Sequence, residues 1–523
     1  MGPKSSATAK PAVQVGGAQL TIENVVDVAA GRSRVALSPD PAFRARIERG
    51  AQFLQHTLDG GDSVYGVTTG YGDSCVVEIP GPLVAELPAH LVRYHGCGTG
   101  PLFDEESTLA VLVARLCSLA RGFSGVRWVL LQRLEELINL RILPCMPTEG
   151  SVGASGDLTP LSYVAAAMIG EREVSHAGAV RPAAEVLREA GLAPPELAPK
   201  EGLAVMNGTA VMTGLACLAW SRAEYLTRLA TRLTSIAALA MQGNREHFHP
   251  RLFAVKPHAG QGEVAAWIYA DMALAEGAGS GARLQDRYSI RCAPHVIGVL
   301  RDALTWMRRD IENELNSAND NPIVDPDERL ILHGGHFYGG HIAFAMDSLK
   351  AAVASVADLM DRQLALLVDA KFNCGLPQNL SGAAPARAPV NHGFKAVQIG
   401  VSACTAEALK LTMPAASFSR STESHNQDKV SMGSIAARDC VRVLELTEQV
   451  AAAHLLATRQ AMLLRLRQGE LREAALSADA RRFIDGVAPY FEFLEEDRRL
   501  DQTLARTAQA VRARAWALYG TEI

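Results

Sequence analysis

Residues 348–368 read SLKAAVASVADLMDRQLALLV, and the spacing of the apolar residues in this stretch predicts a long helix. Apolar residues recur at intervals of four, three, four, four and three, which places them on one stripe of an α-helix. A stripe of this length has to be covered by other helices, so the stretch predicts one member of a helical bundle. The stripe consists of Leu349, Val353, Val356, Met360, Leu364 and Leu367.

Further helical segments lie on both sides of this stretch, and Gly/Pro-rich segments separate them. Convincing strands are few, so we expect any sheet to be small and to lie in the first 200 residues. The sequence therefore predicts a mainly α protein, with a long central helical bundle and a smaller N-terminal mixed domain. The other helical segments are 203–241, 296–316 and 440–466, and the Gly/Pro-rich segments are 194–202, 243–283 and 374–393.

We predict four regions along the chain. They are a disordered tail at 1–17, an N-terminal domain at 18–200, the central bundle at 201–470 and C-terminal helices at 471–523.

Composition excludes several classes of protein. The chain has 523 residues, of which 48% are hydrophobic, and a net charge of −5, so no basic surface points to nucleic acid. The nine cysteines form no CxxC pair and are expected to be reduced. Residues 1–17 lack the apolar core of a signal peptide, and no apolar run approaches the ~18 residues of a membrane span. We expect a soluble, cytoplasmic protein without a nucleic-acid or membrane partner.

Glycine- and histidine-rich motifs give no sign of a nucleotide or metal site. There is no Walker A sequence, and GCGTG at 96–100 lacks the GxGxxG spacing of a dinucleotide site. His333, His336 and His341 lie in HGGHFYGGH and could suggest a metal ion. Because no carboxylate or thiol accompanies them in this loop, we expect a hydrogen-bonded loop and no metal.

The segment 150–170, GSVGASGDLTPLSYVAAAMIG, combines a Gly/Ser-rich turn with the start of an apolar helix. Thr159-Pro160 is a good N-cap and N1 pair, so Ala154-Ser155-Gly156 is expected just before a helix N-terminus.

This tripeptide has a chemical option that most turns lack. In a tight bend the Gly156 nitrogen can attack the Ala154 carbonyl, because glycine has no Cβ to block the approach. Loss of that water and of the Ser155 hydroxyl would give 4-methylidene-imidazol-5-one (MIO), a strong electrophile. A helix N-terminus nearby would favour negative charge that develops on it. Taken alone, however, ASG is more often an ordinary turn.

Seven motifs change this balance. In their order and content they resemble the MIO-dependent aromatic amino-acid ammonia-lyase and aminomutase family, which includes histidine, phenylalanine and tyrosine ammonia-lyases. The similarity extends from about residue 60 to 435, and the 285–440 region also resembles lyases found with bacterial aryl-polyene pigment genes. The motifs are YGVTTGYG (65–72), GSVGASGDLTPLS (150–162), GLAVMNGT (202–209), QDRYSIRCAPHVIG (285–298), ELNSANDNP (314–322), HGGHFYGGH (333–341) and HNQDKVSMG (425–433).

The resemblance implies a role for each matching residue. Ala154, Ser155 and Gly156 would form the MIO autocatalytically, so that no metal or external cofactor is needed. Tyr65, in a Gly/Thr-rich lid loop, would be the base that takes the β-proton. Arg291 would hold the substrate carboxylate. The resemblance further implies that Asn207, Gln285 and Tyr288 position the MIO, the carboxylate and the amine, that Phe337 packs on the MIO or the ring, and that Glu423 lies near the amine.

Substrate choice depends on Tyr94-His95 and on Gln427. Tyr94-His95 lies where the family reads the substrate ring, and it matches none of the common pairs, which are His-Leu, Phe-Leu and Ser-His. His95 could bind a phenol hydroxyl, although it could also point elsewhere. Gln427 lies where histidine lyases carry Glu, which argues against histidine. The sequence also departs from the family at His336, where many members have Asn.

We therefore expect ammonia elimination from L-tyrosine, or next from L-phenylalanine, giving trans-4-coumarate or trans-cinnamate. An aromatic 2,3-aminomutase shares every motif and stays open as an alternative, and histidine ammonia-lyase ranks below both. A non-catalytic helical scaffold would have no use for Ser155 and Tyr65. The resemblance also implies a homotetramer whose active sites are shared between subunits.

Overall fold

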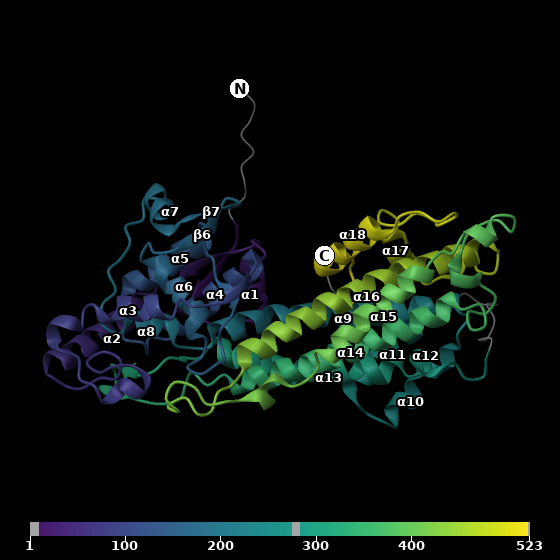
Figure 1. Ribbon diagram of the computed structural model, residues 1–523. Helices are drawn as coiled ribbons and strands as arrows, with labels where there is room; N and C mark the ends of the chain where they lie inside the picture. The colour runs from purple at the N-terminus through teal and green to yellow at the C-terminus, as the bar shows by residue number, and fades with distance from the viewer. Residues whose placement is uncertain (1–9, 275–282, 521–523) are drawn as a thin grey trace. The chain divides into compact units, whose positions relative to one another are not determined.

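The computed structural model describes residues 10–274 and 283–520, and it is mainly α (Figure 1). About 57% of the residues are helical and 7% lie in strands, which confirms the fold class predicted from the sequence. Among the described residues, no helix has the length and apolar character that crossing a membrane requires. The longest helices are α9 (Ala210–Ala240), α13 (Ala293–Leu315), α14 (Gly340–Val368) and α16 (Gly433–Arg467).

The apolar stripe of 348–368 is buried as predicted. All six of its residues are 0% exposed in α14. Buried polar groups link the long helices as well: Gln363 of α14 donates from Nε2 to Thr234 Oγ1 of α9 at 2.9 Å. Such contacts fix how neighbouring helices are aligned, because a buried polar group without a partner is costly.

The chain separates into two compact units that do not follow the order of the sequence. The first comprises 1–221, 308–347 and 414–438, and the second comprises 222–307, 348–413 and 439–523. This division differs from the boundaries that we predicted at 200/201 and 470/471, because the four longest helices each contribute residues to both units.

Of the elements in the described part of the chain, the first unit holds most of the shorter helices and all of the strands. Helix α4 (Glu105–Leu119) is its centre: it is buried from Ser107 to Leu119 and packs against α1, α5 and α8. The other helices of this unit are α1 (Ile22–Ala29), α2 (Pro41–Asp59), α3 (Leu87–Tyr94), α5 (Trp128–Asn139), α6 (Leu158–Met168), α7 (Ala183–Glu189) and α8 (Glu201–Met206). In the second unit the shorter helices are α10 (Pro250–Ala254), α11 (Ala259–Asp271), α12 (Tyr288–Arg291), α15 (Lys395–Lys410), α17 (Ala478–Gly486) and α18 (Asp501–Arg512).

Within 10–274 and 283–520 the strands form four small sheets. Three of them lie in the first 200 residues as predicted, but β8 and β9 form a hairpin beyond residue 320. They are the parallel pair β1 (Ala12–Val15) and β2 (Arg34–Leu37), the antiparallel pair β3 (Thr99–Leu102) and β5 (Pro147–Glu149), the antiparallel sheet β4 (Leu143–Pro144), β6 (Glu173–His176) and β7 (Ala179–Pro182), and the hairpin β8 (Ile323–Asp325) and β9 (Leu330–Leu332).

The predicted disordered tail at 1–17 needs correction. Residues 1–9 lie outside the described residues, but Ala12–Val15 forms strand β1 and pairs with β2. Val13 and Val15 alternate on the buried side of this strand. The alternation is short, and it follows a Lys/Ala/Ser-rich start, so it was overlooked in the sequence.

The helix predicted over 203–241 is interrupted. Helix α8 ends at Met206 and α9 begins at Ala210, so Asn207, Gly208 and Thr209 form a break between two helices. Gly208 has a φ of +142°, a conformation that side chains with a Cβ rarely adopt. The break matters for function, because it exposes the first backbone N–H groups of α9.

A buried ion pair stabilises the first unit. Lys200 Nζ donates to Asp320 Oδ2 and to the Ser124 carbonyl oxygen, both at 2.7 Å. Both charged side chains are 0% exposed. Removing one member would leave the other charge buried without a counter-ion.

We predict that Lys200→Met lowers the free energy of unfolding by about 3–5 kcal/mol, because the Asp320 carboxylate stays buried and loses its cation. Arg32→Met removes an exposed partner of Asp27 and should change it by about 0–1 kcal/mol. Denaturant melts of both variants and the unsubstituted chain measure the difference. Equal shifts for the two variants would contradict the structural role of the buried pair.

Candidate active site

The tripeptide Ala154-Ser155-Gly156 lies between strand β5 and helix α6, just before a helix as the sequence predicted. The predicted N-cap at Thr159 is wrong, because α6 already begins at Leu158 and Asp157 occupies the N-cap position. Its backbone runs directly against the break between α8 and α9, where Gly156 and Gly208 form an isolated parallel bridge. Gly156 has a φ of +71°, and a Cβ on it would lie 2.1 Å from the Gly208 carbonyl oxygen. Only glycine fits this position, because the neighbouring atom is backbone and cannot move aside.

Two donors converge on the carbonyl oxygen of Ser155. The Gly208 backbone N–H donates to it at 3.3 Å, and Asn207 Nδ2 donates at 3.2 Å. Asn207 is 3% exposed, and within the described part of the chain its Oδ1 has no hydrogen-bond partner. The pair of donors would stabilise negative charge on the Ser155 oxygen, and the buried Oδ1 remains an acceptor without a donor.

Asp157, the residue that follows the tripeptide, anchors it to the neighbouring helices. Its backbone N–H donates to the Gly208 carbonyl oxygen at 2.8 Å, so Gly208 brackets the Gly156 peptide on both sides. Its carboxylate accepts the backbone N–H groups of Val211 and Met212, each at 3.0 Å, in the first turn of α9. Ser434 and Ser151 donate to the other carboxylate oxygen. Asp157 therefore ties the tripeptide to the starts of two long helices.

Complete burial raises the pKa of the Asp157 carboxyl to about 6, although these hydrogen bonds oppose the shift. A carboxyl with this pKa changes its charge near neutral pH.

Gln427 contacts the hydroxyl of Ser155. Its Nε2 donates to Ser155 Oγ at 3.3 Å. The Thr422 hydroxyl donates to Gln427 Oε1 at 2.9 Å, which fixes the amide so that its nitrogen faces the serine. A donor on Oγ favours departure of the hydroxyl, because it stabilises the charge that the oxygen acquires.

Glu423 is presented by a strained turn. Glu423, Ser424 and His425 all have a positive φ, of 47°, 54° and 64° respectively. The Glu423 carboxylate accepts the backbone N–H of Asp73 at 3.0 and 3.1 Å from its two oxygens. A Cβ on Gly72 would lie 2.4 Å from Glu423 Oε2, so the loop that contains Tyr65 lies directly on this carboxylate.

Tyr65 is held at its hydroxyl by its own loop and at its backbone by His333. Its hydroxyl accepts the Gly72 backbone N–H at 2.8 Å, and its own N–H donates to His333 Nε2 at 3.4 Å. Burial raises the pKa of the Tyr65 phenol above its ordinary value of 10.0, the hydrogen bond from Gly72 opposes this, and the charge on Glu423 raises it further. In this state the phenol keeps its proton at neutral pH.

Tyr94 and His95 end helix α3 side by side, with ring centroids 4.3 Å apart. His95 Nδ1 lies 3.1 Å from the Leu91 carbonyl oxygen. A carbonyl only accepts, so Nδ1 carries the proton and Nε2 is left as an acceptor. Burial lowers the pKa of His95, which keeps the ring neutral. Tyr94 is 57% exposed, but partial desolvation of its phenol and then the charges of Tyr65 and Glu423 raise its pKa.

The remaining predicted residues are placed as follows. Phe337 is half-buried in the loop between β9 and α14, in the first unit. Gln285, Tyr288 and Arg291 belong to the second unit. Tyr288 is 72% exposed, and the Arg291 guanidinium lies 4.7 Å from its ring centroid while Nε donates to the Asp286 carbonyl oxygen. No hydrogen bond of the Arg291 Nη atoms is found over 10–274 and 283–520.

The histidine-rich loop takes part in the site without a metal cluster. His333 accepts the Tyr65 N–H, and in the part of the chain that the structure describes no group of three or more His, Cys, Asp and Glu residues could hold a metal ion.

Sequence reasoning missed Asp157, Gly208 and Thr422, which hold the tripeptide and Gln427. The signal for the first two was present, since each lies inside a quoted motif next to an assigned residue. Chemically, the tripeptide has the bend, the small residue and the donors on Ser155 O and Oγ that ring closure and dehydration need. The residues present therefore fit an MIO at this position.

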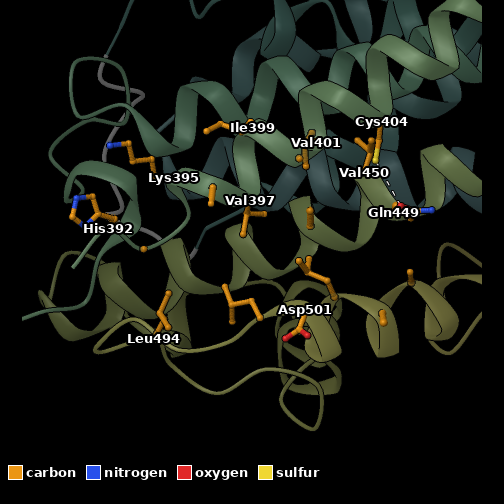
Figure 2. Close-up of a pocket in the computed structure, with 18 of the residues that line it drawn as sticks. His392, Lys395, Val397, Ile399, Val401, Cys404, Gln449, Val450, Leu494 and Asp501 are labelled. Carbon is orange, nitrogen blue, oxygen red and sulfur yellow. Dashed lines mark hydrogen bonds between the residues drawn. The ribbon is translucent and has the colours of Figure 1, made fainter. Parts of the chain in front are cut away.

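A large cavity in the second unit contains none of the predicted site residues. It has a volume of about 970 Å³ and lies between α15, α16 and α18 (Figure 2). Its lining is mainly apolar and includes Val397, Ile399 and Val450, with Asp501 at one side. Ile399 is 66% exposed, so this apolar surface is open.

Known proteins similar to this chain cover nearly its whole length. Residues 20–485 match the sequence profile of the family described as aromatic amino acid lyase. The chain is 36% identical to a histidine ammonia-lyase of Gloeobacter violaceus over 94% of each chain. It is 35% identical to a tyrosine ammonia-lyase of Cereibacter sphaeroides, over 95% of this chain and 97% of the relative. The crystal structure of a tyrosine aminomutase from Streptomyces globisporus superimposes with a TM-score of 0.89 at 34% identity, covering 96% and 97% of the two chains.

We predict that the stability gained from Asp157 depends on pH. The folded pKa of about 6 lies above the ordinary value of 3.8, so this contribution is full below pH 4 and is lost as the pH rises through 6. The free energy of unfolding of the unsubstituted chain, relative to Asp157→Asn, should fall by about 2 kcal/mol between pH 4.5 and 7.5.

Denaturant melts across this pH range measure the difference. Asp327→Asn is the control, because Arg49 and Arg46 lower the pKa of this exposed carboxyl and its contribution is constant above pH 4.5. A difference between Asp157→Asn and the unsubstituted chain that stays constant with pH would refute the prediction.

Proposed function

Because this chain belongs to the aromatic amino acid lyase family, we propose that it eliminates ammonia from an aromatic L-amino acid. L-Tyrosine is the preferred substrate and L-phenylalanine the second, giving trans-4-coumarate and trans-cinnamate. The observation that carries the proposal is the convergence of Asn207, Gly208 and Gln427 on the two oxygens of Ser155. These contacts suit a serine that is converted chemically, since an ordinary turn needs no side-chain donor on its hydroxyl.

The proposal includes an MIO formed from Ala154, Ser155 and Gly156. This group supplies an electrophilic carbon that activates the substrate for loss of its amine. Around it, Asn207 Nδ2 and the Gly208 N–H hold the former Ser155 carbonyl oxygen, where negative charge accumulates. No metal or external cofactor is required by this chemistry.

Tyr65 is the proposed base for the β-proton, and Glu423 governs when it can act. Burial is the largest cause of the raised pKa of Tyr65, and the charge of the Glu423 carboxylate raises this pKa further. A substrate ammonium group next to Glu423 would cancel this influence, so binding of the substrate would lower the pKa of the phenol. This coupling would keep Tyr65 protonated until an amino acid is bound.

His95 supports tyrosine as the preferred substrate. Its Nε2 is an acceptor on a neutral ring, and a phenol hydroxyl is the donor that such an atom can bind. A site that reads a hydroxyl in this way discriminates against the same ring without it. The uncharged Gln427 offers no anion to an imidazole, so histidine ranks last.

The exposed groups of the second unit support a homotetramer with active sites shared between subunits. Tyr288 is 72% exposed beside Arg291, and the open apolar cavity lined by Ile399 and Val450 is typical of surfaces that another subunit covers. In this arrangement Gln285, Tyr288 and Arg291 serve a site that another subunit helps to build. A monomeric mass in light scattering at micromolar concentration would exclude it.

An aromatic 2,3-aminomutase is the second candidate, because a tyrosine aminomutase is among the structural relatives. Incubation of the purified protein with tyrosine, phenylalanine and histidine in turn separates the candidates. An ultraviolet-absorbing arylacrylate with release of ammonia identifies a lyase, and a β-amino acid in chromatography identifies an aminomutase. Turnover of histidine alone would overturn the proposed substrate.

We predict that Ser155→Ala folds but has almost no activity, because without the hydroxyl no methylidene can form. The intact mass of the unsubstituted chain should be lower by two waters. Ser155→Ala should retain at least the water that would come from the Ser155 hydroxyl. Ser175→Ala, in strand β6, is the control and should keep both the activity and the mass deficit. An unsubstituted chain of full mass would rule out the MIO.

We predict that His95→Phe lowers tyrosine turnover and raises phenylalanine turnover. Loss of one hydrogen bond to the substrate ring is worth about 1–3 kcal/mol, or roughly ten- to a hundred-fold in relative kcat/KM. Steady-state kinetics with both substrates measure the ratio. If the ratio stays within a factor of about two, His95 is not the residue that reads the ring, and Tyr94 is tested next.

A further inference from the structure

We infer that Arg115, inside helix α4, is a positioning residue that polarises the Asn207–Gly208 peptide and thereby strengthens the hold of the Gly208 N–H on the Ser155 oxygen. The inference rests on the proposed function, since it concerns how the tripeptide becomes an MIO. It assigns a role to a residue that lies outside every motif discussed above.

The guanidinium of Arg115 is aimed at this one peptide. Arg115 is 0% exposed, and its Nη1 donates to the Asn207 carbonyl oxygen at 2.7 Å. Its Nη2 donates to Ser118 Oγ at 2.9 Å, one turn further along α4. A Cβ on Gly208 would lie 2.3 Å from Nη1, so the glycine is what lets the guanidinium approach.

The two hydrogen bonds lie at opposite ends of one amide group. The carbonyl of Asn207 accepts from Arg115, and the N–H of the same peptide, which belongs to Gly208, donates to the Ser155 carbonyl oxygen. A cation on an amide oxygen draws electron density from the nitrogen and makes its N–H a stronger donor. The charge of Arg115 therefore reaches the Ser155 oxygen through a single peptide bond.

Packing alone does not explain why the buried residue at position 115 carries a charge. Over the described residues Arg115 forms no ion pair with a carboxylate, and its Nε has no hydrogen-bond partner. The nearby Asp320 pairs with Lys200 instead. Burial lowers the pKa of Arg115 to about 10, which still leaves it protonated at neutral pH. The Asp320 and Asp157 carboxylates act on this charge from a distance and oppose the lowering of the pKa, but neither pairs with Arg115. Because burying a cation without a paired counter-ion is costly, a neutral side chain would serve a purely structural role better.

The chemistry of ring formation shows where this charge acts. In the first step a bond forms from the Gly156 nitrogen to the Ala154 carbonyl carbon, and the Ala154 oxygen leaves as water with the protons of the Gly156 and Ser155 N–H groups. In the second step the Ser155 Cα loses its proton, the electron pair forms the Cα=Cβ bond, and Oγ leaves as a second water. No electrons are gained or lost overall.

During the second step negative charge spreads from the Ser155 Cα onto the Ser155 carbonyl oxygen. That oxygen is the one held by Gly208 N–H and Asn207 Nδ2. Stabilising it lowers the barrier to loss of the hydroxyl, and Gln427 assists at Oγ. Arg115 is therefore expected to affect the second water more than the first.

The test compares Arg115→Lys, which keeps the charge, with Arg115→Gln, which keeps a donor for the Asn207 oxygen but removes the charge. Intact mass is followed over time after synthesis of the full chain in a cell-free system. We expect Arg115→Gln to lose the second water roughly ten- to a hundred-fold more slowly, so that chains lacking one water accumulate. Arg115→Lys should recover most of the rate.

Arg465→Met is the matched control. Arg465 is also a buried arginine that donates to backbone carbonyl oxygens, of Ala240, Asn373 and Cys374, but it belongs to the second unit. Its loss should lower the melting temperature and leave both dehydration steps unchanged. If Arg115→Gln does not fold, Ser118→Ala replaces it, because it removes the second anchor of the guanidinium and should slow the second water by roughly two- to five-fold.

The outcomes separate the two claims. An unsubstituted chain that loses no water overturns the proposed function, and this inference with it. An unsubstituted chain that loses two waters, beside Arg115→Gln or Ser118→Ala variants that do so equally fast, overturns the role of Arg115 alone. A similar slowing in Arg465→Met would also overturn it, because the effect would then be one of general stability.

Discussion

The backbone pairing of Gly156 with Gly208 is the contact on which the rest of the site depends. Gly208 donates to the residue before Gly156 and accepts from the residue after it, so two loops far apart in the sequence form one rigid unit. Neither position has room for a Cβ. The break between α8 and α9 provides this pairing, and it also leaves the first N–H groups of α9 free to donate to Asp157. Both donors on the Ser155 carbonyl oxygen belong to this break, whereas Gln427, the donor on Oγ, is fixed by Thr422.

The parts predicted correctly from the sequence are those that depend on local periodicity. The stripe of α14 is buried throughout, and the helices predicted at 296–316 and 440–466 are present as α13 and α16. Local patterns also predicted the place of the tripeptide before α6. Strand β1 was missed because two alternating valines are too weak a pattern to stand out.

What the sequence could not provide is the pairing of distant groups. Gln427 meets Ser155 across 272 positions, and Glu423 meets Asp73 across 350. Such contacts follow from tertiary packing, which no local pattern encodes. The raised pKa of Tyr65 is a further example, since it comes from burial and from Glu423 and not from the residues beside it. The boundaries of the compact units escaped prediction for the same reason, because long helices contribute to both.

Tyr94 and His95 are carried by α3, while the tripeptide is carried by the loop before α6 and locked by Gly208. The part of the site that would read the ring and the part that would form the electrophile thus have separate supports. Substitutions at the end of α3 can change the side chains there without disturbing the Gly156–Gly208 contact, which has no room for a Cβ on either residue. Proteins that share this scaffold can therefore evolve different substrate preferences while the backbone arrangement around the tripeptide stays the same.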